Sequence, residues 1–264
     1  MNALAFHEGA QFTIGDAGVL ARDDVPVRDL GSPCRFLLPA GPTVLAGGRS
    51  GAVLDALSGE RICRHRSPLS SATTFIRDGA LHAVIGSESG DGLVLRLGIG
   101  NRFAPVASLP LHTDSVLGLA ADAEHIFSVC ADASVRLTRI VDFDVEWVRS
   151  QAGAVTGCAT WDQGFVGVSR DRSLKLWRGD GTEESYRVPL SNPIACVAVC
   201  PDSRIVAAGS HAGRVAFFDL VARLWQMSVQ LSFTAVSCIA AVPSQPRVFT
   251  VAGRDGSVHT LRVR

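Results

Sequence analysis

A short phrase recurs seven times along this 264-residue chain: an apolar strand, a turn of Gly, Asp or Ser, and a second strand with alternating apolar residues. The apolar residues that directly follow these turns are separated by 33, 41, 41, 39, 41 and 43 positions. A period near 40 residues that contains several short strands is typical of a radially repeated β-structure. These marker residues are Leu20, Val53, Val94, Val135, Leu174, Val215 and Val258.

Each repeat divides into four predicted strands. The first is apolar and rich in small residues, as in residues 194–198, which is typical of a strand buried on both faces. The third alternates with a period of two, as in residues 174–177, and the fourth is more polar, as expected of an outer edge strand. Because no linker interrupts the repetition, the sequence predicts one all-β domain over residues 1–264.

Composition excludes several classes of partner. The 25 basic and 25 acidic residues balance to a net charge of zero, so nothing favours nucleic acid or an anionic membrane. No apolar run approaches the ~18 residues of a membrane span. The first residues show no basic segment followed by an apolar one, so we expect no signal peptide.

Seven cysteines lie mostly within apolar strand patterns, and their odd number favours buried free thiols in a reducing compartment. We therefore expect an intracellular protein, cytoplasmic or nuclear. Cys196 and Cys200 form the one close pair, but they lack the second pair or the histidines that a zinc site needs. The sequence predicts no metal site and no cofactor.

Catalytic groups are sparse. The seven histidines make no His-x-x-x-His or His-x-His pair, and the glycine cluster at residues 86–92 precedes a strand rather than a helix. The acidic runs 142–146 and Glu183–Glu184 are interpreted as solvated charges of edge segments. We predict no enzyme activity and no small-molecule substrate.

Two motifs resemble the WD40 family. The segment Leu111-His112-Thr-Asp-Ser-Val116 is similar to the family's entry into the first strand, and residues 171–177, which end in Trp177, are similar to its turn and third strand. Repeat four comes closest to the complete His–Ser–Asp–Trp set but has Thr138 in place of Trp. The residues to which the resemblance gives a structural role are His112, Ser128, Asp91, Asp132, Asp171, Trp177 and Asp255.

This resemblance covers the whole chain and implies a seven-bladed β-propeller. It also implies a non-enzymatic scaffold or adaptor that mediates protein–protein interactions within a multiprotein complex. A rival hypothesis is a receptor for a short acidic or modified peptide, because the turns between second and third strands carry basic residues that suit carboxylates and phosphates. The candidate partner-binding residues are Arg49, Arg170, Arg172, His211 and Arg254.

The last repeat ends with its third strand, near residues 263–264. We favour the interpretation in which residues 1–6 begin repeat one, which leaves the seventh blade with three strands. In the alternative, residues 2–7 supply the closing strand, as the N-terminal segment usually does in the family. If the blade is three-stranded, residues 257–263 expose an alternating edge, shielded by Arg262 and Arg264 or open to a strand donated by a partner protein.

Overall fold

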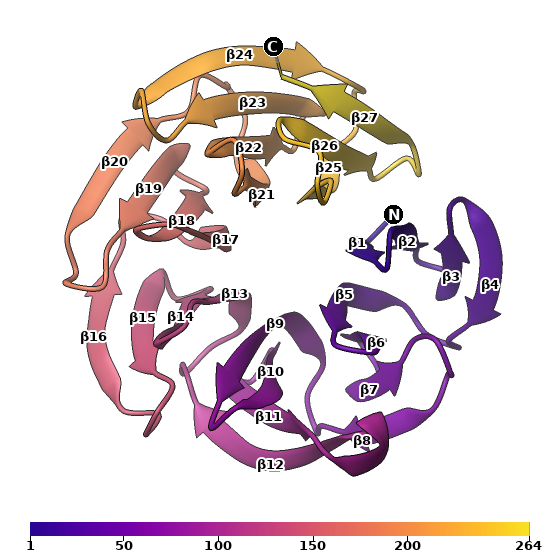
Figure 1. Ribbon diagram of the computed structural model, residues 1–264. Helices are drawn as coiled ribbons and strands as arrows, with labels where there is room; N and C mark the ends of the chain where they lie inside the picture. Colours follow the sequence, from indigo (N-terminus) through magenta and orange to yellow (C-terminus); the bar gives the residue numbers. More distant parts are fainter. Residues whose placement is uncertain (264) are drawn as a thin grey trace. The chain divides into compact units, whose positions relative to one another are not determined.

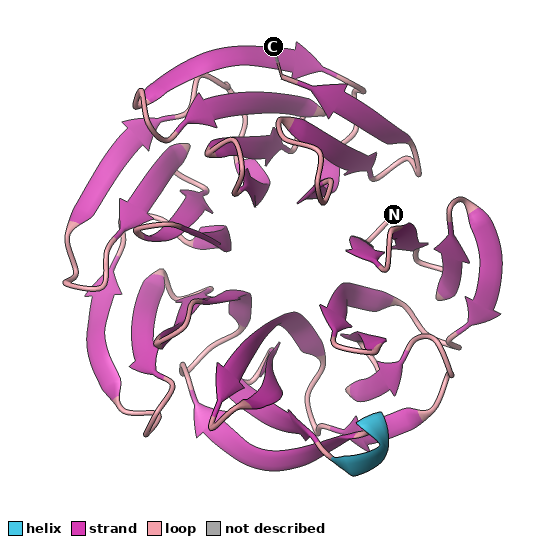
Figure 2. Ribbon diagram, in the orientation of Figure 1, coloured by secondary structure: helices cyan, strands magenta, loops and turns pink. Residues whose placement is uncertain are grey.

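The computed structural model describes residues 1–263, so Arg264, predicted to shield the last edge, lies outside the described residues. These residues form 27 strands and one short 3-10 turn, Ile99–Asn101 (Figure 2). The strands make seven antiparallel sheets, each in chain order. The structure therefore confirms the predicted all-β fold class, a seven-bladed propeller with one three-stranded blade. No helix in this part of the chain is long and apolar enough to cross a membrane.

The chain divides into two compact units. One contains residues 2–151, and the other contains Met1 and the residues from Ala152 onward. That residues 1–264 behave as one domain stays a prediction. The first unit contains sheets one to four. Their strands are β1 (Ala3–His7), β2 (Ala10–Ile14), β3 (Val19–Arg22), β4 (Val25–Asp29), β5 (Cys34–Ala40), β6 (Thr43–Gly48), β7 (Ala52–Asp55), β8 (Arg61–Arg64), β9 (Leu69–Arg77), β10 (Ala80–Ser87), β11 (Asp91–Leu97), β12 (Phe103–Pro110), β13 (Val116–Ala121), β14 (His125–Cys130), β15 (Ser134–Arg139) and β16 (Val145–Ser150).

The second unit contains sheets five to seven, the last with three strands. Within each unit, the first strand of a sheet contacts the first strand of the next one, as for β17, β21 and β25 (Figure 1). The strands are β17 (Val155–Trp161), β18 (Gly164–Ser169), β19 (Ser173–Trp177), β20 (Glu183–Arg187), β21 (Ile194–Cys200), β22 (Ile205–Ser210), β23 (Arg214–Asp219), β24 (Leu224–Gln230), β25 (Val236–Ala241), β26 (Val248–Gly253) and β27 (Val258–Arg262).

The second strand of sheet six, β22, is buried on both faces, which explains why residues 205–209 contain no polar side chain. All six residues of β22 are buried. Val206 and Ala208 belong to a core cluster shared with sheet five, whereas Ile205 and Ala207 belong to one shared with sheet seven. Since successive side chains point to opposite faces of a strand, both faces of β22 contact a neighbouring sheet.

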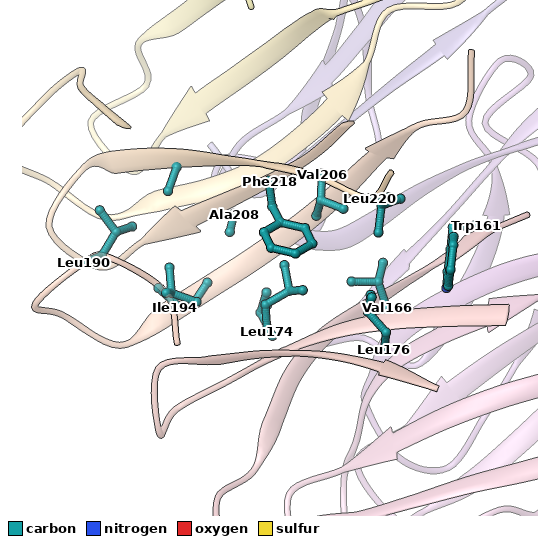
Figure 3. Packing of buried hydrophobic residues seen from close by; sticks show 13 residues of the cluster. Trp161, Val166, Leu174, Leu176, Leu190, Ile194, Val206, Ala208, Phe218 and Leu220 are labelled. Atoms are coloured by element: carbon teal, nitrogen blue, oxygen red, sulfur yellow. The ribbon is translucent and has the colours of Figure 1, made fainter. Parts of the chain in front are cut away.

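The cluster between sheets five and six shows how this packing works (Figure 3). Leu174 and Leu176 of β19 meet Val206 and Phe218 from β22 and β23. Phe218 is completely buried, and burial of such a side chain stabilises the fold by about 1.5–3 kcal/mol. The alternation of the third strands thus provides the contact between sheets.

In sheets two and four to seven, the marker residue pairs with the second-to-last residue of the second strand. In sheet three this pairing belongs to Gly92, and Val94 lies two residues further along, so the predicted register of that repeat is wrong. All seven markers lie in third strands. Six of them are 0% exposed. Val258 is only half-buried, in the outer strand of the three-stranded sheet seven.

The N-terminal segment belongs to sheet one. Strand β1 pairs with β2 in the register Ala3↔Ile14 to His7↔Ala10, and β2 continues to β3 and β4. The favoured interpretation of residues 1–6 is therefore confirmed. The alternative, in which residues 2–7 close the last sheet, is wrong because β1 pairs with β2 of sheet one and with no strand of the last sheet.

Trp177 has the largest side chain among the fully buried residues, at the end of β19. Its ring lies against Gly167 of β18, where a Cβ atom would come within 2.8 Å of the ring. The glycine thus provides the space that this indole fills.

We expect Trp177→Ala to lower the free energy of unfolding by about 3–5 kcal/mol, because it empties a large, fully enclosed site. Chemical denaturation of the purified protein measures this. Phe233→Ala is the matched control: Phe233 is 97% exposed, so its loss should leave the unfolding midpoint unchanged. Equal midpoints for Trp177→Ala and the parent protein would contradict the assignment of Trp177 to the core.

Candidate functional site

In six of the sheets, the turn between the second and third strands is fixed by the same backbone hydrogen bond. The residue directly after each second strand donates its backbone N–H to the carbonyl oxygen just before the first strand of its sheet, at 2.8–3.4 Å. This shared bond makes these positions structurally equivalent. They are Arg49, Glu88, Ala131, Arg170, His211 and Arg254.

Sheets five to seven present a basic side chain at this position in succession. Arg170, His211 and Arg254 are all exposed. Within residues 1–263, none of the three side chains forms an ion pair or a hydrogen bond. Exposed guanidinium groups without an acidic partner can bind a carboxylate or a phosphate in a bidentate manner.

Sheets two to four are different. Arg49 is exposed like its counterparts, but the next equivalent positions hold Glu88 and Ala131. Glu88 accepts a hydrogen bond from the Arg35 guanidinium. The basic row is therefore continuous only in the unit that begins at Ala152.

Arg172, the remaining candidate, is held differently. It is half-buried, adopts a left-handed φ of 67°, and donates from Nη1 to the Ser191 carbonyl oxygen at 3.2 Å. The corresponding turn position in sheet six is Gly213, which adopts a φ of 72°. An arginine at such a position costs roughly 1–2 kcal/mol of backbone strain.

Repeat four assembles a buried polar network. The Nε2 atom of His112 lies 2.8 Å from the Ser128 hydroxyl, and its Nδ1 atom lies 2.9 Å from the Ser134 hydroxyl. Ser134 in turn donates its N–H to the Asp132 carboxylate at 2.7 Å. Asp132 thus contributes through Ser134, a residue that the sequence analysis missed.

An Asp-x-Ser spacing could have identified this serine. Asp171 accepts both the N–H and the hydroxyl of Ser173, at 2.8 and 2.5 Å, and Asp255 does the same with Ser257, at 3.0 and 2.6 Å. The bonds from the Ser257 hydroxyl and N–H lower the pKa of Asp255 to about 2. Each carboxylate therefore orders its own turn.

Ser89 holds the position equivalent to Asp171 in sheet three, and Asp91 lies two residues later, at the start of β11, so the turn position predicted for Asp91 is wrong. The Asp91 carboxylate accepts from the Ser89 hydroxyl at 2.9 Å and from Arg66 Nη2 at 3.4 Å.

The side chains of His112, Cys130 and Asp132 place three potential ligand atoms within 4.8 Å of one another. Both ring nitrogens of His112 already face serine hydroxyls. Burial also raises the pKa of the Cys130 thiol, which disfavours the thiolate that a metal requires. The geometry therefore fits a hydrogen-bonded network rather than a metal centre.

Glu183 and Glu184 lie on the edge strand β20, as predicted, and each also forms specific contacts. Glu183 accepts from Lys175 Nζ and from Trp177 Nε1, each at 2.8 Å. Glu184 accepts from the Tyr186 hydroxyl at 2.6 Å and from Arg223 Nη2 at 3.3 Å. The outer edge of sheet five is polar because it anchors buried and half-buried partners.

We expect stability to fall as the pH decreases from about 6.5 to about 4. Burial, followed by the positive charge of Arg136, lowers the pKa of His112 from 6.5 to about 4. The unfolded chain therefore binds this proton before the folded protein does, at a cost of up to about 3 kcal/mol. Denaturant titrations at several pH values measure the effect.

His112→Gln should flatten this part of the pH profile, whereas His211→Gln, at an exposed histidine, should leave it intact. The same slope in His112→Gln as in the parent protein would contradict the assignment of the proton to His112.

Residues 185–219 match the protein-family model described as "WD domain, G-beta repeat". The matched segment runs from β20 to the end of β23. No curated protein matches the sequence. The crystal structure of the computationally designed Ika8 protein has a similar fold, with a TM-score of 0.70 and 17% identity over 99% of this chain and 96% of that chain.

At 17% identity this likeness concerns the fold alone. WD40 propellers commonly act as protein-interaction scaffolds and are usually non-enzymatic. The family match over residues 185–219 and the seven sheets together show that this chain contains a WD40 repeat within a seven-bladed β-propeller.

Proposed function

We propose that this protein is a non-enzymatic docking platform that binds other proteins within a multiprotein complex. The observation that carries this proposal is the row of exposed basic side chains at equivalent turns, Arg170, His211 and Arg254. The same backbone bond fixes each turn, so binding would lose little backbone entropy. A net charge of zero for the whole chain supports protein partners rather than nucleic acid or a membrane surface.

The alternative function uses the same turns as a receptor for a short acidic or modified peptide. Its support is the absence of acidic partners at Arg49, Arg170 and Arg254 within the described residues. Affinity capture followed by mass spectrometry separates the two functions. Large, stable partners favour a platform, whereas enrichment of one short acidic motif across unrelated proteins favours a receptor.

We expect the triple variant Arg49→Ala, Arg170→Ala and Arg254→Ala to lose captured partners while its melting temperature stays within about 2 °C of the parent. The reason is that these exposed side chains make no contact that the fold requires. The matched control removes three arginines from other exposed turns and ends, Arg22, Arg102 and Arg247. Unchanged partner retention in the first variant, or equal loss in both, would refute the role of the basic turns.

Strand β27 offers a second type of partner contact. Gly253 donates to the Ser257 carbonyl and Val263 donates to the Arg247 carbonyl, so alternate residues of β27 face β26. Antiparallel pairing then directs the N–H and C=O groups of Val258, Thr260 and Arg262 to the other edge. Among residues 1–263, no strand pairs with that edge. We infer that residues 257–263 accept a strand from a partner protein.

Hydrogen exchange tests this contact residue by residue. The amides of Val258, Thr260 and Arg262 should exchange fast in the isolated protein and slowly in the presence of the captured partner. The amides of His259 and Leu261 face β26 and serve as the internal control. Slow exchange at all five amides in the isolated protein would mean that the edge is already covered, and strand addition would be refuted.

The intracellular location, cytoplasmic or nuclear, is also part of this proposal. All seven cysteines are free thiols, which supports a reducing compartment. No cofactor or small-molecule substrate is required for a docking role.

A further inference from the structure

A pocket of about 360 Å³ lies between sheets three and four, within residues 2–151. It opens at the ends of these sheets where first strands turn into second strands and third strands into fourth. The turns that hold Glu88 and Ala131 lie at the opposite ends. The pocket is therefore separate from the turns between second and third strands of its own two sheets.

Two partly exposed aliphatic side chains line the pocket. Ile76, from the end of β9, is 56% exposed, and Val141, from the β15–β16 turn, is 68% exposed. Ile140 beside them is buried in the core between the two sheets. Two large aliphatic side chains thus line a hollow and remain available to a ligand.

Both arginines of the pocket are already engaged. Arg139 donates from Nε and Nη2 to Asp142, at 3.2 and 2.7 Å, and from Nη2 to Asp144 at 3.3 Å. The Arg77 guanidinium lies 4.4 Å from the centre of the Phe143 ring and 3.7 Å from the Asp78 carboxylate. Neither guanidinium is free to bind an anion.

The walls carry unneutralised negative charge. No described residue pairs with the exposed Glu124 carboxylate. Glu146 Oε2 lies 3.3 Å from His125 Nε2, and the other ring nitrogen of this histidine lies 3.5 Å from Asp122. Asp78 offsets the charge of Arg77, and Asp142 and Asp144 offset that of Arg139. The lining carboxylates of Glu124 and Glu146 form no ion pair with a guanidinium group among residues 1–263. The local charge therefore favours a cation.

We propose that this pocket binds a lysine or arginine side chain of a partner protein. The aliphatic stem lies along Ile76 and Val141, and the charged head is placed between Glu124 and Glu146. A volume of about 360 Å³ holds one long side chain and its adjoining backbone. This inference rests on the proposed function, because it takes a protein as the ligand.

A neighbouring hollow supports a peptide rather than a free amine. It measures about 260 Å³ and shares Arg77 and Asp78 with the first pocket. Val106, which is 53% exposed, contributes to its lining. Residues next to the inserted basic side chain can therefore continue across Arg77 into this second site.

Fluorescence anisotropy with three probes tests the proposal. The probes are a dye-labelled peptide, Gly-Ala-Val-Arg-Val-Ala-Gly, its counterpart with citrulline in place of arginine, and unlabelled agmatine as a competitor. Citrulline keeps the shape of arginine without its charge. The arginine peptide should bind at least about tenfold more tightly than the citrulline peptide.

The double variant Glu124→Gln and Glu146→Gln should abolish that preference and keep the parent melting temperature. Its matched control is Glu8→Gln with Asp24→Asn, two exposed acidic residues in the turns of sheet one. This control should bind both peptides as the parent protein does.

Equal binding of the two peptides, or an unchanged preference in the Glu124→Gln and Glu146→Gln variant, would overturn the proposal. Agmatine that competes at the same concentration as the arginine peptide would overturn the assignment to a protein segment and indicate a site for a small cation. Since the probes are synthetic, these outcomes are distinguishable from failure of the docking function, which is judged by captured partners.

Discussion

Packing of each sheet against its neighbours through both faces is the interaction on which this structure depends. In β23, Phe217 belongs to the cluster shared with sheet seven and Phe218 to the cluster shared with sheet five. Each ring is almost completely buried, and each contributes about 1.5–3 kcal/mol. A sheet taken alone would expose these side chains to water, so a repeat gains its stability only from adjacent repeats.

Polar contacts add specificity at the outer strands. Glu184 on β20 of sheet five accepts from Arg223, which lies between β23 and β24 of sheet six. Glu183 is bonded to the buried Lys175 and Trp177 within its own sheet. Charge-assisted hydrogen bonds require a defined geometry, whereas apolar contacts tolerate small shifts. These bonds therefore fix how the outer strands are positioned relative to their neighbours. The turns can then hold their side chains in constant positions.

This rigidity gives the chain surfaces of opposite chemistry, although its net charge is zero. The turns after the second strands of sheets five to seven carry exposed basic groups. Sheets three and four carry carboxylates around a pocket at the ends opposite to their own turns between second and third strands. Each unit thus carries its own exposed charged site, basic in one and acidic in the other. Composition alone conceals this pattern because the charges cancel.

The sequence by itself determined the repeat, the strand count and, except in repeat three, the register. Markers such as Leu174 and Val215 recur because third strands bury an apolar residue at this point. The pattern within each repeat is enough to specify such a residue. The three strands of the last sheet among the described residues match the strand count predicted from the repeats.

Tertiary structure alone decided which polar residues are free and which are bound. Glu88 accepts a hydrogen bond from Arg35, which lies 53 positions away in the chain. Ile76 and Glu146 come from strands far apart in the sequence and line the same pocket. Ser134 joins His112 to Asp132 only because the folded turn brings its hydroxyl to the ring. A periodic pattern specifies which face of a strand a residue lies on and whether that face is buried. Contacts between residues far apart in the chain depend instead on how neighbouring sheets pack.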